Sequence, residues 1–344
     1  MTKIAHIRLE NFTAFEELDQ AFSPGVNVII GANGTGKTHL LKVLYSAAAI
    51  TMGEDSERGF ARKLLGVFNP YQARMTRLIR RQQGLPAAQI IITRNDGAKL
   101  KALIDNQKAD VKDVRVTGEL KWRAISQECA YIPVKEMLAH APGFLATVAK
   151  REIAFEEVYS DILKKAFLPM LKGKVQDSRK TLLATLQKAI EGKVVTKGEH
   201  MFLKNSQGEL EFTLLAEGMR KLALVWLLIQ NGTLLSGSIL FWDEPEANLN
   251  PTLMGELVEI ILELQRLGVQ IFLTTHNYVL LKEFDLRQKK DDKVNYLSLA
   301  RNNNKAVVAS STDSFIHINP NAIASIFDGL YDRELERSFG GRMT

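Results

Sequence analysis

The chain has 344 residues, of which 46% are hydrophobic and 24% charged, with 23 Gly and 9 Pro. These values exclude a disordered, collagenous or coiled-coil chain, and the length allows two domains or one large domain with an inserted lobe. The longest apolar run, 222–229, is too short for a membrane helix, and charged residues near the N-terminus argue against a signal peptide. The single cysteine, Cys129, rules out an intrachain disulfide and a Cys-based zinc site, so we expect a cytoplasmic protein.

The net charge of +6 is concentrated in one segment. Between Glu57 and Arg81 there are seven basic residues and one acidic residue, so the rest of the chain sums to about zero. Such a cluster is the electrostatic footprint of a surface that meets phosphates or an acidic partner, although a solvated helix face beside a nucleotide site has the same pattern. Binding of DNA or RNA is therefore one candidate role of these residues: Arg58, Arg62, Lys63, Arg74, Arg77, Arg80 and Arg81.

A glycine-rich loop stands between a predicted strand and a predicted helix near the N-terminus. Residues 4–9 alternate as in a strand, the apolar run 26–30 indicates a buried strand, and 39–50 has the apolar density of a buried helix. The loop satisfies G-x-x-x-x-G-K-[ST], in which backbone amides cradle phosphates, the lysine reaches the β and γ oxygens and the hydroxyl ligates Mg²⁺. We expect a nucleoside triphosphate with Mg²⁺ to bind here: Gly31, Ala32, Asn33, Gly34, Thr35, Gly36, Lys37, Thr38 and His39.

The middle of the chain mixes strand and helix patterns. Residues 89–93 and 99–105 flank Asn95-Asp96-Gly97 and predict a hairpin with a two-residue turn, and 114–122 and 130–134 are further strand candidates. Residues 137–192 have helical periodicity and predict an inserted helical lobe. A second strand pair is predicted at 201–204 and 209–213.

The C-terminal half alternates helices and strands. Helices are predicted at 217–230, 252–267 and 278–284, and strands at 239–242 and 269–274. The predicted fold is therefore α/β, with a mostly parallel core sheet, an antiparallel β subdomain and the inserted helical lobe. The corresponding segments are 1–136, 137–192 and 193–344.

Two adjacent carboxylates follow the strand at 239–242. Asp243 would hold a metal beside the glycine-rich loop, and Glu244, at the strand tip, could polarise an attacking water. Burying unpaired carboxylates is costly, so a functional role explains this pair better than a structural one. The next strand ends in Thr274, Thr275 and His276, at the edge where parallel sheets bind ligands, so we group His276 with Lys37 and Glu244 as catalytic candidates.

Together these motifs resemble the nucleotide-binding domain of ABC-type ATPases. The order is Gly31 to Thr38, then Leu215 to Met219 opening a helix, then Asp243 to Pro251, then Thr275-His276. The phrase Ile7 to Phe15 is similar to the opening of the SMC, RecF and OLD-like branch, which includes ATPase components of antiphage systems such as Septu and retron-associated ones. The resemblance implies a P-loop fold of ABC/SMC-head type that binds ATP with Mg²⁺.

The resemblance also implies a dimer. The signature segment Leu215, Ala216, Glu217 and Gly218 would contact the γ-phosphate of ATP held by the opposite protomer, which requires Gly218 to be open to a second copy. Ala216 stands where the family usually has serine, so one hydroxyl donor, worth roughly 1.5 to 3 kcal/mol, is lost unless Arg220 or Lys221 compensates. Asn248 and Asn250, in the segment that resembles the family's D-loop, could cross the same interface. A homodimer or higher oligomer with slow hydrolysis is the expectation.

Two assignments within the resemblance have alternatives. The glutamine that contacts metal and water is assigned to Gln127, before the strand at 130–134, with Gln72, Gln82 and Gln83 as rivals. Phe12 or Phe15 could stack on adenine or belong to the core.

The missing parts predict a separate effector. The 56 residues of 137–192 are too few for a long coiled coil, and no acidic cluster after His276 suggests a Toprim nuclease, so we expect a partner polypeptide such as a nuclease, in antiphage defence. The alternatives are a RecF-like DNA-repair clamp and a scaffold that binds ATP without hydrolysing it.

Overall fold

A computed structural model describes residues 1–82, 84, 86–150, 155–173 and 177–340. Within these ranges, six strands form a central sheet in the order β14-β13-β3-β12-β11-β7. Neighbouring strands are parallel, except that β14 is antiparallel to β13. This confirms the mostly parallel core of an α/β fold. The strands are β3 (Val26–Gly31), β7 (Cys129–Ile132), β11 (Ile239–Asp243), β12 (Gln270–Thr275), β13 (Val294–Arg301) and β14 (Val307–Thr312).

A second sheet of five antiparallel strands, counted in the described part, has the order β2-β1-β4-β5-β6. The predicted hairpin β4–β5 is present, but its loop has three residues, because Arg94 N donates to Ala98 O and Gly97 lies at φ 79°. The prediction of one strand over 114–122 is wrong: Gly118, at φ 88°, ends the strand, and a Cβ there would lie 2.0 Å from Lys99 O. The strands are β1 (Ile4–Phe12), β2 (Phe15–Ala21), β4 (Ala88–Arg94), β5 (Lys99–Ile104) and β6 (Arg115–Thr117).

Helices cover both faces of the central sheet. Successive residues of a strand point to opposite faces, so Val28 belongs to the core that contains side chains of α7, α8 and α9, whereas Ile29 belongs to the core with α1, α2 and the antiparallel sheet. Both cores are therefore built on a strand that the sequence correctly predicts to be fully buried. The helices are α1 (Lys37–Ala49), α2 (Gly53–Phe68), α3 (Glu119–Arg123), α7 (Glu217–Gln230), α8 (Met254–Arg266) and α9 (Tyr278–Arg287).

The segment predicted as a helical lobe contains α4 (Phe144–Ala149), α5 (Glu157–Ala166) and α6 (Asp177–Ala189). It is followed by a three-stranded sheet, within the described residues, of order β10-β9-β8. Its strands are β8 (Lys193–Lys197), β9 (His200–Asn205) and β10 (Gly208–Glu211), of which β8 was not predicted.

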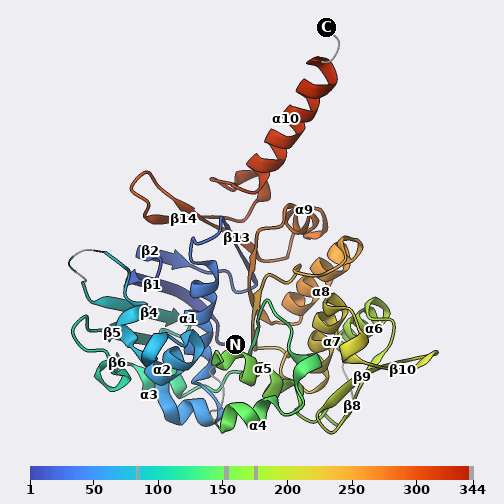
Figure 1. Cartoon of the computed structure of the whole chain (residues 1–344), viewed down its shortest axis with the longest axis horizontal. Helices are drawn as coiled ribbons and strands as arrows, with labels where there is room; N and C mark the ends of the chain where they lie inside the picture. Colours follow the sequence, from blue (N-terminus) through green and yellow to red (C-terminus); the bar gives the residue numbers. More distant parts are fainter. Residues whose placement is uncertain (83, 85, 151–154, 174–176, 341–344) are drawn as a thin grey trace.

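The chain ends in a helix, α10 (Ala324–Gly340), that extends away from the body (Figure 1). Its first turn is attached to α9, because the rings of Phe327 and Tyr278 stack with centroids 4.4 Å apart. Further along, apolar side chains such as Leu330 and Tyr331 are exposed. Among the helices that the structure describes, none has the length and hydrophobicity needed to span a membrane.

Candidate active site at the carboxyl edge of the central sheet

The glycine-rich loop joins β3 to α1 in a conformation that other residues would strain. Gly31, Gly34 and Gly36 all have positive φ. A Cβ at Gly31 would lie 2.3 Å from Leu299 O, and one at Gly36 would lie 2.7 Å from the Phe15 ring. No side chain caps the start of α1, so its first N–H groups are available to an anion. Lys37 closes the loop by donating from Nζ to Gly31 O (2.7 Å) and Ala32 O (3.2 Å).

Asp243, at the end of β11, is surrounded by hydroxyl groups. Its Oδ1 accepts from Thr38 Oγ1 (3.1 Å) and from Thr274 Oγ1 (2.5 Å), and its Oδ2 accepts from the Tyr131 hydroxyl (3.3 Å). Burial and the nearby Asp243 keep the pKa of Tyr131 well above its ordinary value, so this phenol remains a donor. The sequence predicts Thr274 at this edge but assigns it no partner, and it gives no role to Tyr131, because strand pairing, not sequence spacing, brings both to Asp243.

The donors at this point fit Mg²⁺. The Thr38 hydroxyl and the Asp243 carboxylate are hard oxygen ligands, and Mg²⁺ commonly takes one or two protein groups plus phosphate oxygens and water. Among the described residues, no cluster of three or more His, Cys, Asp or Glu side chains could hold a metal without such help.

Glu244 and His276 meet at the same edge. Glu244 Oε1 lies 3.1 Å from His276 Nδ1. Glu244 has φ 47°, a region that non-glycine residues rarely adopt, and its N–H donates to Thr274 Oγ1 (3.1 Å). Strained backbone of this kind costs of order 1 to 3 kcal/mol and collects at functional sites. Thr274 therefore fixes both the Asp243 carboxylate and the main chain that carries Glu244.

A cavity of about 650 Å³ opens beside the glycine-rich loop. His39, from α1, lines it, and burial together with the charge of Lys42 lowers the pKa of its imidazole. Arg301, from β13, also lines it and donates to Gly34 O (2.9 Å). The other walls come from the β1–β2 turn, from the segment around Tyr71, which adds the cations Arg77, Arg80 and Arg81, and from the β13–β14 turn, which adds Lys305. Phe12 and Phe15 are fully buried, so they belong to the core and not to this cavity.

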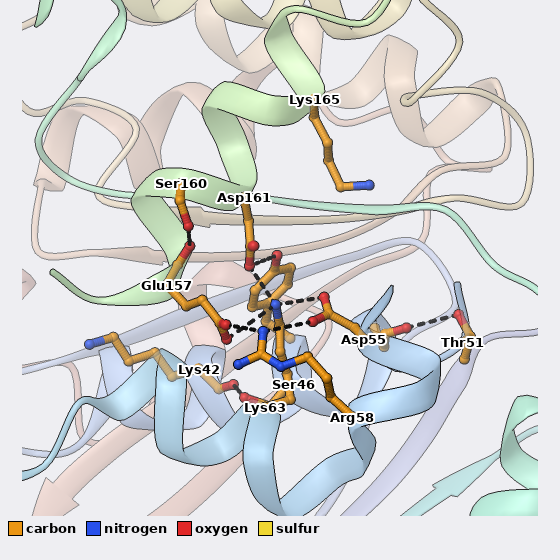
Figure 2. A network of polar contacts seen from close by, with 12 residues as sticks. Lys42, Ser46, Thr51, Asp55, Arg58, Lys63, Glu157, Ser160, Asp161 and Lys165 are labelled. Carbon is orange, nitrogen blue, oxygen red and sulfur yellow. Dashed lines mark hydrogen bonds and ion pairs between the residues drawn. The ribbon is translucent and has the colours of Figure 1, made fainter. Parts of the chain in front are cut away.

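The basic segment is divided between two places. Lys63 is fully buried and bonds Asp55 (2.6 Å) and Asp161 (2.7 Å), and Arg58 pairs with Glu157, as Figure 2 shows. Lys63 is thus neutralised inside the protein, so the prediction that it binds nucleic acid is wrong. Arg58 is exposed although it is paired, so its role in nucleic-acid binding stays a prediction. Arg77, Arg80 and Arg81 line the cavity beside the loop, and Arg62 and Arg74 are exposed elsewhere.

Gln127 lies away from this site. It precedes β7, at the opposite edge of the parallel sheet, and its side-chain amide donates to Thr2 O (2.6 Å) and Gly237 O (2.8 Å). Its assignment as a metal contact is therefore corrected: the amide joins the two chain segments at the far edge. Among its rivals, Gln72 is exposed, Gln82 bonds Asn11 (3.3 Å), and Gln83 lies outside the described residues.

The signature segment presents a different surface from the one expected. Gly218 is buried, because its Cα packs against Asn248 and Leu249 of the same chain, where a Cβ would lie 2.7 Å from Asn248 O. Leu215 is buried as well, whereas Ala216 is exposed and Glu217 half-buried. The expectation that Gly218 is open to a second copy is thus not met in the single chain, and Ala216 and Glu217 form the accessible tip of α7.

The cations and amides near this tip have partners in the same chain. Arg220 bonds Glu136 (2.5 Å), and Lys221, 1% exposed, donates to Ala247 O (2.7 Å). Neither is free to replace the missing serine hydroxyl. Asn248 bonds Glu217 (2.9 Å), and the Asn250 side chain accepts from Thr252 N (3.1 Å).

Comparison with known protein families supports the P-loop interpretation. A family model described as "AAA domain" matches residues 6–197, and one described as "AAA domain, putative AbiEii toxin, Type IV TA system" matches residues 144–282. The solved SMC head domain of Pyrococcus furiosus, bound to the C-terminal domain of ScpA, is similar with a TM-score of 0.56 at 13% identity, covering 97% of this chain and 100% of that one. The SMC head of Thermotoga maritima reaches 0.50 at 13% identity, covering 90% and 99%. These structures show that the fold is shared.

Curated relatives of similar sequence are named DNA replication and repair protein RecF. The protein of Lacticaseibacillus casei (strain BL23) is 36% identical over 91 residues, which cover 26% of this chain and 24% of that protein. The protein of Bacillus cytotoxicus is 27% identical over 212 residues, which cover 62% of this chain and 47% of that protein. These matches span between a quarter and half of the relatives' length. The family model covers more than half of the sequence, and the phosphate loop lies in a fold shared with SMC heads. The chain therefore belongs to the AAA-domain family of ATPases of SMC and RecF head type.

Proposed function

We propose that the chain binds ATP with Mg²⁺ and hydrolyses it at the carboxyl edge of the central sheet. The observation that carries this proposal is the convergence of Thr38, the adjacent pair Asp243 and Glu244, and His276, from three separate segments, beside the phosphate loop. Lys37 and the first amides of α1 bind the phosphates. Thr38 and Asp243 would hold Mg²⁺, which supplies positive charge to the phosphoryl oxygens.

Glu244 is the residue that orients the attacking water. Its carboxylate is partly accessible, unlike that of Asp243, and His276 lies within hydrogen-bond distance of it. The nucleoside binds in the cavity beside the loop, where Tyr71 and His39 offer aromatic surface and Arg77, Arg80 and Arg301 offer positive charge.

ATP binding also brings two copies together in this proposal. The tip of α7 carries Ala216, which is exposed, and the preceding Leu214, which is 69% exposed, so an accessible apolar surface lies next to helix N–H groups that no side chain caps. Gly218 contributes only after the Asn248–Leu249 segment moves away, so dimerisation requires a rearrangement within each chain. A hydrolysis cycle would then open and close the pair and control a separate effector.

The biological setting that we favour is antiphage defence. The description of the family model over residues 144–282, which names a toxin and antitoxin system, supports it. Phage challenge of cells that express the chain with its neighbouring genes tests this role. Equal plaque counts with the native chain and with Glu244→Gln would contradict it.

A RecF-like DNA clamp is the second candidate, because curated relatives carry that name. It predicts binding of free DNA by the purified chain with a steep loss of affinity as salt rises. Binding that is absent at low salt would eliminate the clamp.

The first prediction of this proposal concerns Lys37→Ala. Removing the ammonium group deletes charge-assisted hydrogen bonds to two phosphates, so the affinity for Mg·ATP should fall by about 100-fold. Titration with a fluorescent ATP analogue measures it. The matched control is Lys42→Ala on the same helix, which should bind within a few-fold of the native chain because Lys42 pairs with Glu156 instead.

The second prediction concerns Glu244→Gln. Hydrolysis should fall by about 10² to 10⁴-fold, because the carboxylate that orients water is lost while the phosphate contacts remain. With ATP the variant should show the mass of two chains by light scattering. A monomer at saturating ATP would refute the dimer, and turnover equal to that of the native chain would favour the non-hydrolysing scaffold.

A further inference from the structure

Glu246, two residues after Glu244, has no place in the chemistry described so far. It is 5% exposed, and its Oε1 accepts from the Thr275 hydroxyl (2.6 Å) and from the main-chain N–H of His276 (3.4 Å). Its other oxygen, Oε2, is buried without a hydrogen-bond partner in the described structure. A buried carboxylate with one unsatisfied oxygen is costly, so its position calls for a reason beyond packing.

The partners of Glu246 belong to the turn that carries His276. The Thr275 hydroxyl donates to Glu246 and accepts from Asn277 N (2.9 Å). Asn277 caps α9, because its side chain accepts from Leu280 N (3.1 Å). A continuous set of hydrogen bonds thus runs from the loop after β11, through Glu246, to the first turn of α9. The main chain of His276 belongs to this set of hydrogen bonds, and its imidazole is half exposed.

Without Glu246, little else fixes this imidazole. Among the described residues, the ring makes its polar contact with Glu244, at 3.1 Å, and the main-chain N–H of Glu244 is itself held by Thr274. Two adjacent hydroxyls of β12 therefore have different partners. Thr274 holds the Asp243 carboxylate and the Glu244 main chain, and Thr275, through Glu246, holds the turn that carries His276.

We propose that Glu246 is a positioning residue that ties the histidine turn to the loop after β11 and so keeps His276 within hydrogen-bond distance of Glu244. This proposal rests on the ATPase assignment of Glu244 and His276, but not on dimer formation. Glu246 touches neither substrate nor metal in this role, since its bonds are to Thr275 and to the main chain of His276.

The charged groups that face Glu246 are consistent with a fixed carboxylate. They are Glu244 and His276 from the adjoining loops, Lys221 from α7 and Lys37 from α1. Burial raises the pKa of Glu246, while the Thr275 hydrogen bond and His276 oppose that rise. Burial lowers the pKa of both lysines, and the negative charge of Glu246 is one of those that oppose this lowering.

The test compares Glu246→Gln with Glu246→Ala. Glutamine keeps an oxygen that can accept from Thr275 and from the His276 N–H, whereas alanine removes both bonds. ATP affinity should stay within about threefold in both variants, since the phosphate loop is untouched. Turnover should fall by about 10 to 100-fold in Glu246→Ala and by much less in Glu246→Gln. The control is Glu256→Ala, a half-buried carboxylate at the start of α8 outside this set of bonds, which should match the native chain.

A measurement without turnover separates this inference from the proposed function. In the native chain, Glu244→Gln should shift the NMR resonances of the His276 ring, because the two side chains touch. In the Glu246→Ala background the same substitution should leave them unmoved. If the native chain does not hydrolyse ATP, the proposed function fails while this coupling still tests Glu246. A coupling that persists in Glu246→Ala, or a Glu246→Gln variant as inactive as Glu246→Ala, overturns the positioning role.

Discussion

Lys3 is a buried cation that has no carboxylate partner among the described residues, at the edge of the central sheet opposite the candidate site. Its residue is 8% exposed, and Nζ donates to Gly268 O at 2.6 Å. Burial lowers its pKa to about 8. The uncharged form is therefore favoured in the folded chain relative to the unfolded chain.

This shift predicts a pH dependence of stability. Between about pH 8 and pH 10.5 the unfolded chain still holds the proton that the folded chain has released, so the free energy of unfolding should rise with pH, by about 3 kcal/mol at most. Below about pH 8 the full cost of the buried charge is present. Urea unfolding of the native chain and of Lys3→Met, near pH 7 and near pH 10, measures the difference. A difference that does not change with pH would show that Lys3 is not desolvated.

At the residue scale, the sequence predicts those site residues that belong to a short, recognisable motif. Lys37, Thr38, Asp243, Glu244 and His276 converge as expected, because each follows a recognisable strand. Tyr131 and Arg301 were missed, and Thr274 was placed at this edge without a role, since only strand pairing brings the three to their partners. The error at Gln127 was avoidable from the sequence alone: it precedes a strand of a parallel sheet, so it had to lie at the edge opposite the phosphate loop.

At the scale of elements, the phosphate loop depends on glycine through contact with the antiparallel sheet. Gly36 has φ 93°, and a Cβ there would also lie 3.0 Å from Ala14 Cβ, against a Phe15 ring that is fully buried and cannot retreat. The loop shape and the β1–β2 turn are therefore fixed together.

Gly36→Ala should reduce both stability and ATP affinity. The left-handed backbone costs alanine about 1 to 2 kcal/mol, and the contact with Phe15 displaces the loop in addition. Gly97→Ala is the matched control, because Gly97 also has a positive φ, 79°, but a Cβ added there would meet no atom within 4 Å. Thermal unfolding and ATP titration should show a similar loss of stability from backbone strain in both variants, but lost affinity in Gly36→Ala alone. Equal ATP affinities would contradict the argument.

Elements with strong periodicity were predicted best. The helix at 217–230 agrees with α7, and the buried strand at 26–30 agrees with β3 to within one residue. The errors occur where contacts between distant segments determine whether a strand forms and where it ends. Gly118 ends β6 because of its close approach to Lys99, and β8 forms as a partner of β9, neither of which the local pattern contains.

At the scale of the whole molecule, one ionic cluster joins the two sides of the fold. Lys63 on α2 bonds Asp161 on α5, and Tyr45 on α1 donates to the same carboxylate at 2.7 Å (Figure 2). The helix that begins at the phosphate loop is thus attached to the helical segment that leads towards the signature residues. Burial lowers the pKa of Lys63, but its three carboxylate neighbours outweigh this and raise it overall, so the side chain stays charged.

Lys63→Met should lower the free energy of unfolding by about 3 to 5 kcal/mol, because Asp55, Glu157 and Asp161 would lose their shared cation in a buried place. Arg62→Met, at the exposed neighbouring position, should change it by less than about 0.5 kcal/mol. Urea unfolding compares the two. A loss below about 1 kcal/mol for Lys63→Met would show that water compensates the carboxylates.

The attachment of α10 has a geometrical consequence. Phe327 rests on Tyr278, only two residues beyond His276, while the rest of this 17-residue helix stands clear of the body. At 1.5 Å per residue the helix is about 25 Å long, so a tilt of about 5° at its root would swing the far end by about 2 Å. A movement of Tyr278 that is too small to change the position of the His276 imidazole would therefore be several times larger at the far end of α10.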